Sequence, residues 1–118
     1  MKNFLAVFTG SPTHPAHQKW EALDAETRKN REYEGMKAWG DWVSKNQNRI
    51  VEMGGPLGRT KRVEPKGISD IRNQMAAYTV VKAESHEEAA QLFLNHPHFM
   101  IFPGDGVEIM EVLPIPRM

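Results

Sequence analysis

Residues 75–96, MAAYTVVKAESHEEAAQLFLNH, place a strand directly before a helix. The segment Met75 to Ala83 is rich in β-branched and aromatic side chains, which predicts a strand. Ser85 is followed three residues later by Glu88, the spacing of a capping box at the start of a helix. We expect this helix to stop before Pro97, because a proline disfavours helical backbone in the residue that precedes it.

Two apolar runs at the ends of the chain predict further strands. Phe4 to Phe8 reads FLAVF and is closed by Gly10-Ser11-Pro12, and Val107 to Leu113 reads VEIMEVL after a turn at 104–106. Between Asp24, which can cap a helix, and residues 46–48, apolar side chains recur at spacings of three and four, so a long amphipathic helix is expected there.

The remaining segments are less regular. Residues 10–32 are expected to form a loop or irregular insertion, with one helical turn around Trp20 and Leu23. Ile50 to Met53 leads into a Gly54-Gly55-Pro56 turn, and Leu57 to Val63 alternates weakly, as an edge strand does. The order predicts one α+β domain over residues 1–118. Its fold is a β-α-β-β-α-β ferredoxin-like plait, with room for an extra hairpin strand.

The predicted strands are apolar on both faces. Phe4, Ala6 and Phe8 point to one side of the first strand, and Leu5 and Val7 point to the other. Two helices cover only one face of such a sheet, so a second copy of the chain is expected to cover the other. The alternative is that segment 10–32 folds over this open face.

Composition excludes several classes of protein. The 118 residues include no cysteine, so a disulfide framework, a thiolate metal site and a cysteine nucleophile are excluded. The 15 basic and 15 acidic residues balance, which argues against nucleic acid or a membrane as a partner. No run is long and apolar enough for a signal-peptide core or a membrane span, so a cytoplasmic location is expected.

The C-terminal half resembles the YCII-related family, also called YCII-like or DGPF-type. The resemblance is carried by AYTVVKAESHEEAAQLFLNHPHF at 77–99 and VEIMEVLPI at 107–115, and less specifically by GGPLGRTKRV and AWGDWV upstream. It implies a dimeric α/β barrel, in which two plaits pack their sheets together. Some members resemble lyases or isomerases of small organic acids, with a histidine and an aspartate as acid and base. The DGPF tetrapeptide itself is absent, and Ile68-Ser69-Asp70-Ile71 lies near its position.

His96, His98 and Asp70 are the candidate catalytic residues. An imidazole titrates near neutrality and can move a proton, although a histidine at a helix end also has a purely structural use. Asp70 is the preferred partner of these histidines, because it lies near the position of the DGPF tetrapeptide. Asp105, between two glycines, is expected in a solvated turn.

Trp39, Trp42, Tyr78 and Arg59 are the candidate ligand-binding residues. The two tryptophans either fill the core or wall a cavity. Arg59 belongs to a basic edge that either guards a strand against aggregation or attracts a carboxylate substrate. No metal site and no cofactor are expected.

The leading hypothesis is a cofactor-independent enzyme of the lyase or isomerase type, which uses His96 or His98 on a small organic acid or lactone. A non-catalytic dimeric module that binds a small ligand or regulates a partner is the alternative. A cofactor-free monooxygenase is a third hypothesis, on fold analogy alone.

Overall fold

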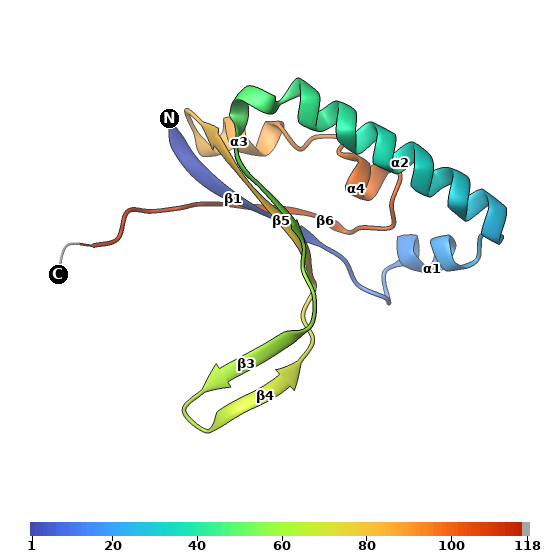
Figure 1. Cartoon of the computed structure of the whole chain (residues 1–118), viewed down its shortest axis with the longest axis horizontal. Coiled ribbons are helices and arrows are strands. Elements are labelled where there is room, and N and C mark those ends of the chain that lie inside the picture. Colours follow the sequence, from blue (N-terminus) through green and yellow to red (C-terminus); the bar gives the residue numbers. More distant parts are fainter. Residues whose placement is uncertain (117–118) are drawn as a thin grey trace.

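The computed structural model of the protein describes residues 1–116, so residues 117 and 118 of the predicted domain lie outside the described residues. The strands in this part are β1 (Lys2–Thr9), β2 (Ile50–Pro56), β3 (Thr60–Glu64), β4 (Gly67–Ile71), β5 (Met75–Ala83) and β6 (Gly106–Glu111) (Figure 1). The α-helices are α1 (Pro15–Glu21), α2 (Ala25–Lys45), α3 (His86–Gln91) and α4 (Pro97–Met100), and a 3-10 turn, Gln47–Arg49, precedes β2.

Four strands form one antiparallel sheet in the order β2-β5-β1-β6. Along the chain, α2 connects β1 to β2, and α3 lies between β5 and β6. This architecture is that of a ferredoxin-like plait, as the element order predicted. The dimeric barrel remains a prediction. Within the described residues no helix has both the length and the apolar character needed to cross a membrane.

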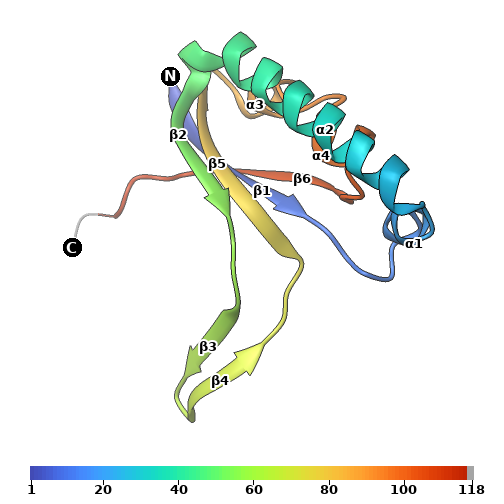
Figure 2. The same cartoon turned by 45° about the vertical axis from the view of Figure 1, so that its right-hand side comes forward.

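All the helices lie on one side of the sheet (Figure 2). The core between them contains the inward side chains of β1 and β5, joined by Phe93 after α3. The register pairs Phe4 with Val81, Ala6 with Thr79 and Phe8 with Ala77, so cross-strand neighbours point into the same core. The alternation predicted from FLAVF is therefore the one observed, with Phe4, Ala6 and Phe8 facing the helices.

The Ser85 cap is confirmed, because its hydroxyl accepts from the amide of Glu88 at 3.1 Å. The helix that it opens is shorter than expected and ends at Gln91. Asn95, at a φ of 59°, has left-handed backbone geometry that interrupts helical structure, and Pro97 then begins α4. The helix therefore does stop before Pro97, but the proline also starts a second short helix.

Segment 10–32 is more regular than the predicted loop, because the single turn expected around Trp20 is the helix α1. The helix α2 begins at Ala25, directly after the predicted cap position Asp24. The imidazole Nδ1 of His14 accepts from the amide of Ala16 at 3.1 Å and caps α1, which begins on Pro15. Trp20 of α1 packs against Phe102, on the helical side of the sheet. The segment therefore does not cover the open face.

The predicted edge strand 57–63 is instead part of a hairpin. β3 and β4 pair antiparallel as a separate two-stranded sheet, from Thr60 opposite Ile71 to Glu64 opposite Gly67. The hairpin continues the line of β2 and β5 away from the helices (Figures 1 and 2). A positive φ at Gly67 closes its turn, which a residue with a Cβ adopts only with strain.

Candidate functional site

An apolar groove of about 640 Å³ lies between α2 and the adjoining ends of β2 and β5. Its lining is dominated by aromatic, methionine and glycine residues: Phe8, Met36, Trp39, Gly40, Trp42, Val43, Met53, Gly54, Gly55, Pro56, Ala77, Tyr78, Thr79 and Phe102. Apolar walls with few polar groups are typical of a small-molecule site.

The β2 side of the groove depends on a glycine. Gly54 has a φ of +64°, and a Cβ at this position would collide with the backbone carbonyl of Tyr78 on β5. The absent side chain lets β2 approach β5 closely despite the irregular register between Glu52 and Gly55.

His96 is completely buried directly behind this groove. Its ring centroid lies 4.5 Å from that of Trp39, 4.8 Å from that of Trp42 and 5.0 Å from that of Phe8, and all three of these aromatic residues line the groove. His96 is itself not among the lining residues, so the imidazole lies one side chain away from the groove.

The hydrogen bonds of His96 define its neutral form. Nδ1 accepts from the amide of His98 at 3.0 Å, so the proton of the neutral ring is on Nε2. This Nε2 is buried and has no hydrogen-bond partner within the described residues. Burial lowers the pKa of His96 to about 4, and the neighbouring His98 contributes to the shift. His96 is therefore a neutral, unused N–H donor at pH 7.

His98 has the complementary arrangement. Its Nε2 lies 2.7 Å from the carbonyl oxygen of Thr9, which can only accept, so Nε2 carries the proton and Nδ1 keeps its lone pair when the ring is neutral. Burial lowers the pKa of His98, while the Thr9 carbonyl and the Asp105 carboxylate oppose that shift. A Cβ at Gly104 would overlap the His98 ring, so only glycine fits beside it.

Asp105, rather than Asp70, is the aspartate that acts on a buried histidine, because its negative charge opposes the lowering of the His98 pKa by burial. Its side chain is only 21% exposed, and one carboxylate oxygen lies 3.6 Å from Nδ1 of His14. The solvated turn expected for Asp105 is therefore wrong, because its backbone amide donates to the carbonyl of Thr9 and draws the turn against β1.

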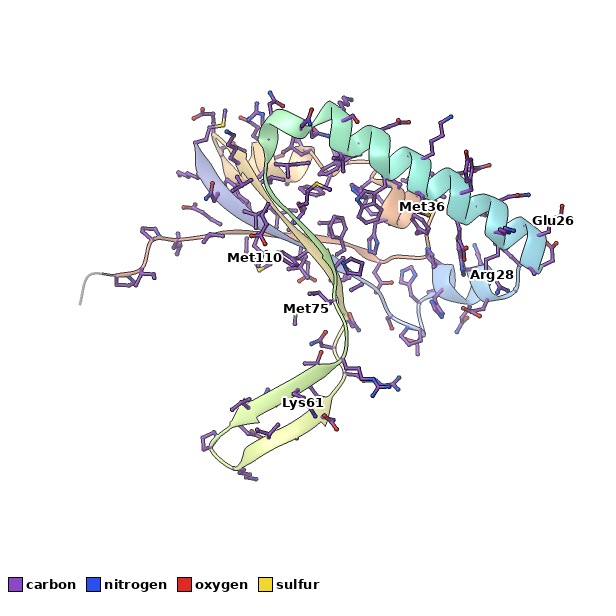
Figure 3. The ribbon with its side chains drawn as sticks, viewed as in Figure 1. Glu26, Arg28, Met36, Lys61, Met75 and Met110 are labelled. Carbon is purple, nitrogen blue, oxygen red and sulfur yellow. The ribbon has the colours of Figure 1, made fainter. Side chains whose placement is uncertain are left out.

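Asp70 lies on the hairpin, where it pairs with Lys61 at 2.7 Å, and its side chain is 81% exposed. Figure 3 shows Lys61 on the hairpin, well away from Met36 at the groove. The structure does not bring Asp70 to either candidate histidine, because the residues that follow β2 leave the main sheet.

Among the predicted ligand-binding residues, Trp39, Trp42 and Tyr78 line the groove and Arg59 does not. The Trp42 indole is also fixed by donating to the carbonyl of Leu92 at 2.8 Å. Tyr78 is at the edge, since the register pairs it with Val7 on the open face and its hydroxyl donates to Glu52 at 2.6 Å. Arg59 is exposed before β3.

Sequence reasoning missed Phe8, Met36, Met53 and Phe102 as groove residues. Phe8 was recognisable as an inward side chain of the first strand. Met36 belongs to the apolar stripe that predicted the long helix, but nothing in that stripe marks it as a groove residue. Met53, on β2, and Phe102, in the loop after α4, have no periodic pattern that marks them. Among the described residues, no three histidine or acidic side chains are grouped so as to hold a metal.

Comparison with family models and with curated proteins finds no match. Among solved structures, the chain is similar to 5-chloro-2-hydroxyhydroquinone dehydrochlorinase from Burkholderia phenoliruptrix AC1100, determined with bound 2,5-dihydroxybenzoquinone. The TM-score is 0.52 at 16% identity, with 91% of this chain and 89% of that chain covered. The likeness shows that the two chains share a fold. Membership of the YCII-related family remains a prediction.

Proposed function

We propose that this protein binds a compact, ring-shaped organic molecule in the aromatic groove and acts on it as a cofactor-independent lyase or isomerase. One observation carries the proposal: the groove wall formed by Phe8, Trp39 and Trp42 is backed by the buried imidazole of His96, whose Nε2–H has no partner. A buried donor without a partner is costly, and such groups gather at functional sites.

The two imidazoles suit different steps of one proton transfer. The Nε2–H of His96 donates to a substrate oxygen and stabilises the negative charge that develops there. His98 accepts a proton from the substrate at Nδ1, and Asp105 favours the resulting imidazolium. The electron pair left on the substrate then expels a leaving group in a lyase, or is reprotonated at another atom in an isomerase.

Trp39 controls access in this proposal. It lines the groove and contacts the rings of both histidines, with centroid separations of 4.5 Å to His96 and 6.1 Å to His98. The indole is half-buried, and we expect it to turn aside when the substrate binds.

The structural relative supports the reaction class and the ligand shape. Its name describes removal of the elements of hydrogen chloride, which is a lyase reaction, and its bound molecule is a hydroxylated ring. The groove contains no basic side chain among its lining residues, which favours a neutral or weakly acidic ring over a carboxylate. Arg59 therefore has no part in this site within one copy of the chain.

We also propose that the protein is a homodimer joined through the open face of the sheet. The face away from the helices presents Leu5, Val80 and Met110 side by side, as their register shows. A second copy is the simplest partner for an apolar face of this kind.

Calorimetric titration with 2,5-dihydroxybenzoquinone tests the groove. Gly40 lines it, and nothing lies within 4 Å of a Cβ built there, so Gly40→Phe is expected to block the groove without disturbing the core. Lys37→Phe is the matched control, because Lys37 is exposed on the same helix and does not line the groove. Binding that survives in Gly40→Phe would place the ligand elsewhere.

Chloride release from 5-chloro-2-hydroxyhydroquinone, together with deuterium uptake by a panel of ring compounds in heavy water, tests catalysis. His98→Asn is expected to lower the rate by roughly 10²-fold or more while leaving ligand binding in place. An unchanged rate in a folded His98→Asn protein would exclude the proposed base.

A non-catalytic ligand-binding module is the second candidate. It is favoured by the groove lining, in which Tyr78 is the single titratable side chain. Binding that is lost in Gly40→Phe, without deuterium uptake or turnover of any compound of the panel, would establish this function instead.

A further inference from the structure

The hairpin formed by β3 and β4 has no core of its own. Every residue from Lys61 to Ile71 is exposed, including the apolar Val63 at 76% and Ile68 at 71%. The side-chain hydrogen bonds of these residues stay within the hairpin, as in the pair of Lys61 with Asp70. A single two-stranded hairpin is at best marginally stable in water, so an ordered one needs a surface to pack against.

The hairpin also differs from the rest of the chain in charge. Residues 59–72 contain five basic and two acidic side chains. Because the whole chain has fifteen of each, the remainder has ten basic and thirteen acidic side chains. The hairpin is therefore positive and the body is negative, and the two are complementary.

The open face supplies a surface that suits the hairpin in both polarity and charge. Met110, 43% exposed, lies on this face (Figure 3), and the register places it opposite Leu5 of β1. Glu108 of β6 is exposed on the same face, opposite Val7. β6 is also the last strand of the sheet, so its outer edge is unpaired within the described residues.

The hairpin is long enough to reach a second copy. Pro65, at the hairpin tip, lies nine positions after Pro56 at the end of β2. Because extended chain rises by roughly 3.3 Å per residue, the reach is about 30 Å. Packed sheets lie only about 10 Å apart. An arm of this length therefore extends past the contact between two sheets and onto the partner.

We propose that the β3–β4 hairpin is an exchanged arm, which packs in the homodimer on the open face of the second copy beside β6, where Glu108 is exposed. The inference rests on the homodimer proposed above and adds to it the segment that each copy contributes. Val63 and Ile68 supply the apolar contact, and Lys61, Arg62 and Lys66 meet the acidic body.

The absence of cysteine makes cross-linking a direct test. Purified Ile68→Cys and Met110→Cys chains are mixed, treated with a short bis-maleimide linker and separated on a denaturing gel. We expect a linked product that contains one chain of each variant. Met100→Cys replaces Met110→Cys in the control, since Met100 is 56% exposed but belongs to α4 on the helical side, and no linked product is expected.

Ile68→Asp provides a second measurement. If the hairpin packs on the partner, this change raises the dissociation constant of the dimer at least tenfold, and added salt weakens the wild-type dimer through the same charged contacts. Asn30→Asp, at an exposed position of α2, also adds one negative charge and is the charge-matched control, which is expected to leave the dimer unchanged.

The outcomes separate the arm from the dimer. A wild-type dimer that Ile68→Asp does not weaken and that gives no Ile68–Met110 link would overturn the exchanged arm and leave the homodimer standing. A variant with both Ile68→Cys and Met110→Cys in one chain is also treated with the linker at high dilution. A link formed only within single chains of this variant would show that the hairpin folds back on its own body and would overturn the exchanged arm. A mass near 13.4 kDa for the wild type in light scattering would overturn both proposals.

Discussion

His96 and His98 are two residues apart, yet they have different hydrogen-bond partners and therefore different chemistry. The amide of His98 occupies Nδ1 of His96, while the carbonyl of Thr9 occupies Nε2 of His98. One ring thus retains a free N–H and the other retains a free lone pair. The proline between them begins α4, so the two side chains lie on a helix start, where the backbone turns sharply.

Burial of these rings makes stability depend on pH. The pKa of His96 falls from 6.5 to about 4 on folding, so between these values the unfolded chain takes up a proton that the folded chain does not. The free energy of unfolding is expected to fall by about 3 kcal/mol as the pH drops from 7 to 4. The lowered pKa of His98 acts in the same direction.

Urea unfolding between pH 4 and pH 7.5 measures this dependence. His96→Asn is expected to make the curve of stability against pH shallower, whatever it costs in absolute stability. His17→Gln, which changes a half-buried histidine of α1 away from this pair, serves as the control and should retain the steep wild-type curve. Equal slopes in wild type and His96→Asn would mean that His96 is protonated in the folded protein.

Among the elements, α2 contains two glycines with opposite roles. A Cβ at Gly35 would overlap the ring of Phe102, whereas nothing lies within 4 Å of a Cβ at Gly40. Gly40→Ala is expected to stabilise the protein by about 0.5–1 kcal/mol, because alanine is the better helix former. Gly35→Ala is expected to destabilise it by about 1–3 kcal/mol, because the core has no room for the added methyl group. Thermal unfolding of both variants distinguishes the effects, and a stabilised Gly35→Ala protein would contradict the close packing of Phe102.

The start of α3 depends on its cap. Ser85→Ala removes the hydroxyl that accepts from the amide of Glu88 and is expected to cost about 1 kcal/mol in urea unfolding. Ser44→Ala is the matched control, because Ser44 is exposed within α2 and should change stability by less than about 0.5 kcal/mol. If the two variants lose the same stability, the cap contributes nothing beyond an ordinary surface position.

For the whole molecule, the two sides of the sheet are expected to differ in their tolerance of charge. Met110→Asp, on the open face, should leave the fold intact but raise the dimer dissociation constant at least tenfold, a change of about 1.4 kcal/mol. Met100→Asp, exposed on the helical side, should leave the dimer unchanged. Analytical ultracentrifugation compares them, and equal dissociation constants would show that the open face is not the contact.

Local patterns were sufficient to predict most of the strands and helices. Each of these patterns lies within the element that it specifies, so its residues are close together in the sequence. The examples are the run FLAVF, the Ser85–Glu88 spacing and the apolar spacing after Asp24. The same patterns predicted an apolar open face, but they left open whether the tryptophans fill the core or wall a cavity. Segment 10–32 was mispredicted because a short helix that begins on a proline and is capped by a histidine has little apolar periodicity.

The composition of the site could not be read from the sequence, because its contacts join distant parts of the chain. Thr9 and His98 are 89 positions apart and meet only because β1 lies beside β6 in the sheet. The same register brings Asp105 to this corner, and the departure of the chain after β2 carries Asp70 and Arg59 away on the hairpin. Residue types and periodicity therefore determined the elements and the candidate histidines. Which aspartate accompanies them depends on the long-range pairing of strands, which no local pattern encodes.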